Sequence, residues 1–188
     1  SANKEFYSNY WAHRWKYRFM YDMQIKRKLF LFAIRQANIE QHQKKVLDIG
    51  FGSGDILFTF DTSCELYGVD LSYNAVESAK QHATKKGYRI AEFLKLDLDE
   101  ESLPFENETF DVVICSHTLE HLRDDVKMVR EMHRTLKDDG VGVIIVPINE
   151  KPGEDPNHVR VYTKQSLLSQ LERVGFHARF TGENEYIG

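Results

Sequence analysis

Short apolar runs alternate with segments of helical spacing along most of this chain. Almost wholly apolar runs are typical of parallel strands that are covered on both faces. Runs of this kind predict five strands at 45–50, 64–70, 91–97, 109–116 and 141–147, and residues 176–186 predict one more.

Four segments between these runs show the periodicity or the boundary residues of helices. They cover residues 23–41, 72–87, 124–140 and 163–175. Ser72 and Thr163 are suited to cap the starts of the second and fourth helices, and Gly87 and Gly175 to end them. The alternation predicts an α/β fold, with a Rossmann-like doubly wound, mostly parallel sheet and helices on both faces.

The composition is that of an ordinary globular domain, with 41% hydrophobic and 29% charged residues over 188 positions. No apolar run approaches the roughly 20 residues that span a bilayer, so we expect no membrane partner. The first residues show no secretory apolar region, and we expect a cytoplasmic protein. Cys64 and Cys115 fall in predicted strands, where buried thiols are expected rather than a disulfide.

The net charge of -4 hides an asymmetry between the start of the chain and the rest. Residues 1–45 carry a net +7 and the remainder carries -11. A basic arm can attract an anionic substrate or a nucleic acid. The many aromatic residues of this arm favour the alternative, a helix that docks on its own acidic domain.

Acidic residues and a glycine turn follow the predicted strands, at the sheet edge where parallel α/β folds bind ligands. "VLDIGFGSGD" places Gly50, Gly52 and Gly54 at every second residue between a strand and an expected helix. A dinucleotide fingerprint has the spacing G-x-G-x-x-G, so an NAD-dependent oxidoreductase is disfavoured. Asp48 precedes the turn, and its negative charge suits a ligand that carries positive charge rather than a pyrophosphate.

Asp70 and Asp97 end the second and third predicted strands. Asp70 lies 20 residues after Gly50, where a carboxylate can accept hydrogen bonds from both hydroxyls of a ribose. Asp97 is placed to accept from the exocyclic amine of an adenine, or simply to cap a turn. Together with the glycine turn, these residues predict a site for an adenosine-containing cofactor.

The stretch "SHTLEHL" after the fourth strand has the spelling His-x-x-Glu-His of a zinc hydrolase. His117 and His121 on one helical face could hold a metal ion, with Glu120 nearby as a base. Such a site needs a third ligand on another element, and no pattern in the sequence indicates one. We therefore expect no metal.

These segments together resemble the class I S-adenosylmethionine-dependent methyltransferases, in the small-molecule, type 11-like subgroup. The matching pieces are "VLDIGFGSGD", "ELYGVDLS", "FLKLDLDEESLPFENETFDVVICSHTLEHL", "VREMHRTLKDDGVGVIIVP" and "HVRVYTKQSLLSQLERVGF", which cover about residues 45–178. The resemblance implies S-adenosylmethionine as cofactor and S-adenosylhomocysteine as product. It also implies that the segment SHTLEHL after the fourth strand binds no zinc.

The resemblance assigns the cofactor contacts by position. It places the methionine part of the cofactor beside Asp48, Gly50 and Gly52, the ribose and adenine beside Asp70 and Leu71, the adenine edge beside Asp97 and Leu98, and the sulfonium beside Ser116 and His117. It further implies an N-terminal helical lid over residues 1–42, in which Tyr10, Arg14 and Trp15 touch the cofactor. The alternative is that these side chains only pack the lid onto the domain of residues 43–188.

A methyl sulfonium is already activated, so the main task of the protein is to align an acceptor and exclude water. A hydroxyl acceptor also needs a base, and imidazole is the usual one near neutral pH. His117, His121 and His158 are the candidates. The alternatives are that His121 only packs near the cofactor and that His117 acts through its backbone.

The function predicted in this way is methyl transfer from S-adenosylmethionine to a small molecule, at oxygen rather than nitrogen. An RNA or protein methyltransferase that uses the basic arm is one alternative, although no Asn-Pro-Pro-Tyr type tetrapeptide follows the fourth strand. A non-catalytic cofactor-binding domain is another. The family's sheet ends in an antiparallel hairpin, and here we expect its last strand to be missing or the edge to be built differently, which leaves a homodimer open.

Overall fold

The computed structural model describes residues 16–151 and 153–181. Its centre is one sheet of five strands, all paired in parallel, in the order β3-β2-β1-β4-β5. The strands are β1 (Lys45–Ile49), β2 (Glu65–Asp70), β3 (Ile90–Lys95), β4 (Phe110–Ser116) and β5 (Leu136–Ile145). The predicted parallel α/β sheet is therefore confirmed.

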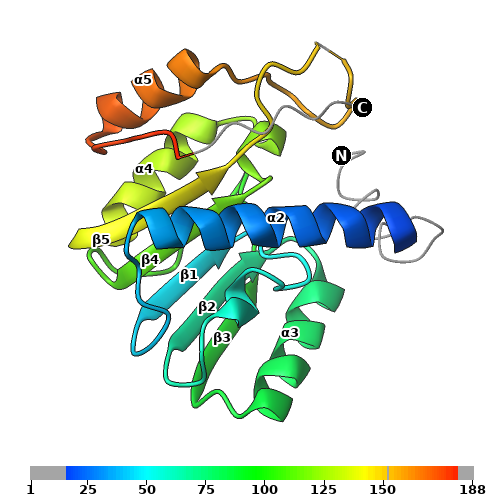
Figure 1. Cartoon of the computed structure of the whole chain (residues 1–188), viewed down its shortest axis with the longest axis vertical. Helices are drawn as coiled ribbons and strands as arrows, with labels where there is room; N and C mark the ends of the chain where they lie inside the picture. The colour runs from blue at the N-terminus through cyan, green and yellow to red at the C-terminus, as the bar shows by residue number, and fades with distance from the viewer. Residues whose placement is uncertain (1–15, 152, 182–188) are drawn as a thin grey trace.

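Helices cover both faces of this sheet (Figure 1). They are α2 (Lys16–Gln36), α3 (Tyr73–Lys86), α4 (Asp125–Thr135) and α5 (Lys164–Val174), with short 3-10 turns η1 (Leu57–Thr59) and η2 (Leu119–His121). Phe30 of α2 and Val76 of α3 belong to one hydrophobic cluster. Met128 of α4 and Leu167 of α5 belong to a second, so each pair of helices covers its own face.

The helix boundaries predicted from Ser72, Gly87, Thr163 and Gly175 are confirmed. The Ser72 side chain accepts a hydrogen bond from the Ala75 amide, and the Thr163 side chain accepts one from the Ser166 amide. Gly87 and Gly175 have left-handed backbones at φ 81° and 116°, which favour glycine.

Three predicted helix boundaries are wrong. α2 starts at Lys16 instead of residue 23, and it ends at Gln36 instead of residue 41 because Asn38 turns left-handed at φ 53°. α4 ends at Thr135 instead of continuing to residue 140. The Thr109 amide donates to the Thr135 carbonyl, and residue 136 pairs with the start of β4, so the pairing with β4 draws the chain out of the helix and into β5.

The segment after α5 differs from the predicted strand 176–186. Residues 176–181 form no strand, and residues 182–186 lie outside the described part. This segment contacts the domain through its side chains. The Phe176 ring packs edge-on against the His133 ring, and the Arg179 guanidinium donates to the Gln36 carbonyl at the end of α2. The prediction of a missing or altered last strand stays untested.

Cys64 and Cys115 are buried free thiols, as expected. Across the described ranges, no helix combines the length and apolar character needed to cross a membrane.

Candidate active site

A cleft of about 1800 Å³ begins at the carboxyl ends of the strands and continues along the edge strand β5 to Asp138 near the start of that strand. Ligand pockets are commonly about 300–1,000 Å³, and the cleft is larger because it includes this open edge. Its lining includes the predicted residues Asp48, Gly50, Gly52, Asp70, Leu71, Asp97, Leu98, Ser116, His117, His121 and His158. Tyr10, Arg14 and Trp15 lie outside the described residues, so their predicted contacts stay untested.

The sheet register brings these residues together. Ile49 of β1 lies between Val69 of β2 and Cys115 of β4. The next residue of each strand or turn, Gly50, Asp70 and Ser116, therefore reaches the same edge of the sheet.

The glycine turn has a backbone that only glycine adopts without strain. Gly50, Gly52 and Gly54 have φ of 72°, 54° and 77°. A Cβ on Gly50 would collide with the side chain of Thr118, whose hydroxyl donates to the Ile49 carbonyl. The helix expected after this turn is absent from residues 55–60, which contain only η1. A ligand here thus meets backbone amides of a turn and not a helix N-terminus.

Asp70 is held by that turn. Its Oδ2 accepts the Gly52 amide at 2.8 Å and its Oδ1 accepts the Ser72 amide at 2.8 Å. Burial raises the pKa of Asp70, while these two backbone donors oppose the rise. A carboxylate has about four lone-pair sites, so two remain for donors in the cleft.

Asp48 is almost wholly buried, at 2% exposure. Burial, followed by the charge of Asp70, raises the pKa of Asp48 to about 8. Asp48 is therefore mostly protonated at neutral pH until a cation comes close, which would favour its carboxylate.

Asp97 forms hydrogen bonds within a turn that follows β3. Its Oδ1 accepts the Asp99 amide at 3.3 Å, and its carbonyl accepts the amides of Glu100 and Glu101. The residue thus caps a turn and lines the cleft, and its contact with an adenine stays a prediction.

His117 leaves β4 with a left-handed backbone at φ 51°. Its amide donates to the Ile145 carbonyl at 2.7 Å, and its Nδ1 lies 3.3 Å from Oε1 of the wholly buried Glu120. Burial acts to raise the pKa of Glu120, but hydrogen bonding and the charge of His117 lower it overall. Glu120 is therefore a buried carboxylate whose anionic form His117 supports.

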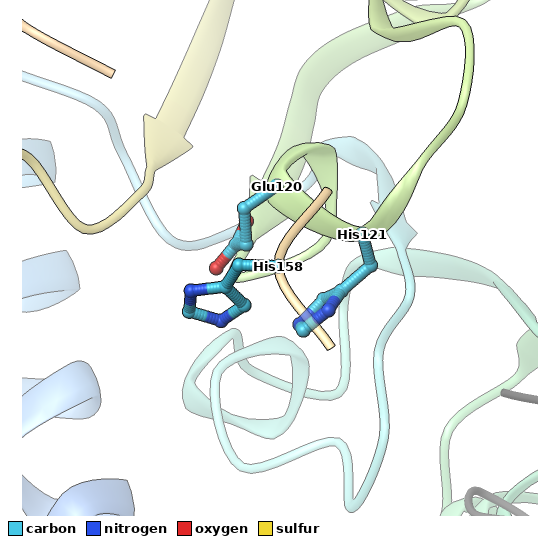
Figure 2. A group of neighbouring side chains, drawn as sticks. All are labelled: Glu120, His121 and His158. Carbon is cyan, nitrogen blue, oxygen red and sulfur yellow. The ribbon is translucent and has the colours of Figure 1, made fainter. Parts of the chain in front are cut away.

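His121 does not share a helical face with His117, because η2 is a single 3-10 turn. The ring of His121 instead meets that of His158, with centroids 4.8 Å apart (Figure 2). His121 Nδ1 contacts the Asn157 carbonyl at 3.1 Å, and His158 Nδ1 contacts Glu150 Oε2 at 2.7 Å.

Arg160 holds the loop that carries His158, and the sequence did not single it out. Its guanidinium pairs with the buried Asp125 and donates to the carbonyls of Leu122 and Arg123. These contacts tie the loop between β5 and α5 to the segment after β4. The only sequence signal is one arginine in a loop, which no periodic pattern distinguishes.

Comparison with known proteins identifies related chains. The family model described as "Methyltransferase domain" matches residues 47–144. The "Uncharacterized methyltransferase YcgJ" of Bacillus subtilis is 38% identical over 145 residues, which are 70% of this chain and 55% of that protein. The crystal structure of YcgJ has a TM-score of 0.65 at 29% identity, covering 77% of this chain and 66% of that one.

Two further relatives have named acceptors or pathways. A phosphoethanolamine N-methyltransferase of Triticum aestivum is 30% identical over 71% of this chain and 28% of that protein. A ubiquinone biosynthesis O-methyltransferase of Haemophilus ducreyi is 35% identical over 52% of this chain and 43% of that protein. The chain thus spans about half or less of the length of these curated relatives.

Proposed function

The chain belongs to the methyltransferase-domain family, and from that premise we propose that it transfers the methyl group of S-adenosylmethionine to a small-molecule acceptor. The observation that carries the proposal is the convergence of two carboxyl groups and the glycine turn in one cleft. Asp70 accepts the Gly52 amide, and Asp48 lies buried directly before the same turn.

The chemistry of these groups fits S-adenosylmethionine. Asp70 receives the ribose hydroxyls on the lone pairs that its two backbone donors leave. Asp97 and Leu98 border the adenine. Asp48 faces the methionine part, whose ammonium and sulfonium charges favour the carboxylate over the protonated acid. The cofactor supplies a methyl group that is already activated by positive charge on sulfur.

The task of the chain is then to orient the acceptor and remove its proton. His117, His121 and His158 line the cleft beside the end of β4. Burial lowers the pKa of His121, which keeps its imidazole neutral near pH 7.

We assign oxygen as the nucleophile because three imidazoles able to take a proton line the acceptor side. The acceptor oxygen bonds to the methyl carbon, the electron pair of the broken C–S bond stays on sulfur, and the hydroxyl proton passes to an imidazole or to water. The names of the relatives include both an N- and an O-methyltransferase, so they do not decide between the two.

The test is methyl transfer from radiolabelled S-adenosylmethionine to a panel of small acceptors, with hydroxylated compounds set against matched amines. We expect label in the hydroxylated compounds and a loss of most of it in Asp70→Ala. Transfer to amines alone would overturn the oxygen assignment. Cofactor binding with no transfer to either set, RNA or protein would favour a non-catalytic binding domain.

A further inference from the structure

We propose that Glu120, His121 and His158 bind a divalent first-row transition-metal ion on the acceptor side of the cleft. One potential ligand atom from each residue lies within 4.8 Å of the others (Figure 2). Ligands of one ion at about 2.0–2.2 Å are no more than about 4.4 Å apart. Small side-chain adjustments therefore bring the three groups onto a common ion.

The third ligand comes from a separate element, which the sequence pattern did not indicate. Glu120 and His121 belong to η2, and His158 belongs to the loop between β5 and α5. The His-x-x-Glu-His motif pairs His121 with His117. In the structure, His121 is instead grouped with His158.

Both imidazole rings have a hydrogen-bonding partner at Nδ1. A carbonyl can only accept, so His121 Nδ1 donates its proton to the Asn157 oxygen at 3.1 Å. His158 Nδ1 has the Glu150 carboxylate as its partner at 2.7 Å. These contacts orient both rings, as hydrogen-bonding partners commonly do for metal-binding histidines.

The charges of the surroundings favour a cation. Glu120 is wholly buried, its Oε1 lies 3.3 Å from His117, and its Oε2 has no hydrogen-bond partner within the described residues. A buried, incompletely bonded carboxylate is unfavourable without a counter-charge. Asp155 adds an oxygen 3.7 Å from His158 Nε2.

The mixed ligand set selects the kind of ion. Two imidazoles and one carboxylate suit manganese, iron, cobalt or zinc better than magnesium or calcium, which prefer oxygen ligands.

The loop that carries His158 is fixed against η2. The Val159 amide donates to the Glu120 carbonyl at 2.9 Å. Arg160 pairs with Asp125, and Tyr162 donates to the same carboxylate at 2.7 Å. These contacts hold the ligands near one another before an ion arrives, which preorganises the site.

The role of the ion rests on the proposed function. A metal with open coordination positions binds a hydroxyl oxygen and lowers its pKa. The cluster shares its cleft with Ser116 and His117, on the acceptor side. We therefore assign the acceptor to the class of compounds that offer two adjacent oxygens to a metal, such as vicinal diols, catechols or hydroxy acids.

The experiment is a titration of the whole chain with Co²⁺ after treatment with EDTA and dialysis, followed by visible absorption. We expect one saturable site, with affinity reduced at least about tenfold in His158→Ala and in Glu120→Gln. His42→Ala removes an exposed imidazole elsewhere and is the matched control, with unchanged affinity expected. No saturable site, or equal affinity in all variants, would overturn the proposal.

Two further measurements keep the outcomes separate. Circular dichroism checks that Glu120→Gln is folded, and His158→Gln, a change in a loop, serves if it is not. Calorimetry of S-adenosylmethionine with the EDTA-treated wild type tests the proposed function independently. Cofactor binding without the cobalt site would overturn the metal inference alone. A cobalt site without cofactor binding would uphold the metal and remove its assigned role.

Discussion

Asp48 offers a quantitative test because its protonation links folding to cofactor binding. The perturbation is Asp48→Asn, which keeps the shape of the side chain and removes its titration. The pKa of Asp48 is about 8 in the folded protein, against an ordinary value of 3.8. Burial is the main cause, and the charge of Asp70 adds to it.

Proton linkage gives the direction in which the free energy of unfolding changes with pH. Between pH 3.8 and about 8 the folded protein keeps a proton that the unfolded chain has lost. The contribution of Asp48 to stability is therefore fully present below the unfolded pKa and declines as pH rises through the folded one. One pH unit corresponds to about 1.36 kcal/mol for one proton, so from pH 5 to 8 we expect a loss of about 2–4 kcal/mol.

The assay is urea unfolding followed by far-UV circular dichroism at pH 5, 6, 7 and 8. From pH 5 to 8, the free energy of unfolding of the wild type should fall by about 2–4 kcal/mol more than that of Asp48→Asn. Asp138→Asn, at an exposed position, is the matched control and should follow the wild type. Parallel stability curves for the wild type and Asp48→Asn would refute the reasoning, because Asp48 would then titrate alike in both states.

Cofactor binding gives an independent readout of the same group. A positive charge next to Asp48 favours ionisation, so binding of S-adenosylmethionine at pH 7 should release about one proton. Calorimetry in Tris and in phosphate measures this release from the difference in apparent enthalpy. Asp48→Asn should release none, and equal release in both proteins would contradict the assignment.

Two further predictions concern backbone and buried charge. Gly50→Ala should lower the free energy of unfolding by about 1–3 kcal/mol more than Gly87→Ala, because both have left-handed φ but only Gly50 faces Thr118; equal losses in urea unfolding would contradict the steric argument. Asp125→Ala should lower the free energy of unfolding by about 3 kcal/mol in the same assay, because it leaves the guanidinium of Arg160 without its carboxylate. A decrease below about 1 kcal/mol would show that this ion pair does not stabilise the fold.

The sheet and the cofactor edge could be predicted because their signals are local. An apolar run marks each strand, and parallel strands bring their following residues to one edge. Asp48, Gly50 and Asp70 could be placed at one edge of the sheet for that reason, and they line the same cleft there. Ser72 and Gly87 were found because a cap depends on residues within one turn of it.

The parts that were missed depend on contacts between distant segments. The end of α4 is set by pairing of its last residues with the start of β4. The meeting of His121 and His158 is set by the ion pair of Arg160 with Asp125 and by the Val159 amide. No periodicity in the sequence records such contacts, so the acceptor side required the structure.

The most direct test of the cofactor site is calorimetric binding of S-adenosylmethionine and S-adenosylhomocysteine to the wild type and to Asp70→Ala, with Asp139→Asn, at an exposed position, as control. Thermal unfolding confirms that the variant is folded, since Asp70 also accepts the Gly52 and Ser72 amides. The account predicts binding by the wild type and the control in the micromolar range, and a loss of about tenfold or more in Asp70→Ala. Absence of binding to the wild type, or equal affinity in Asp70→Ala, would contradict it.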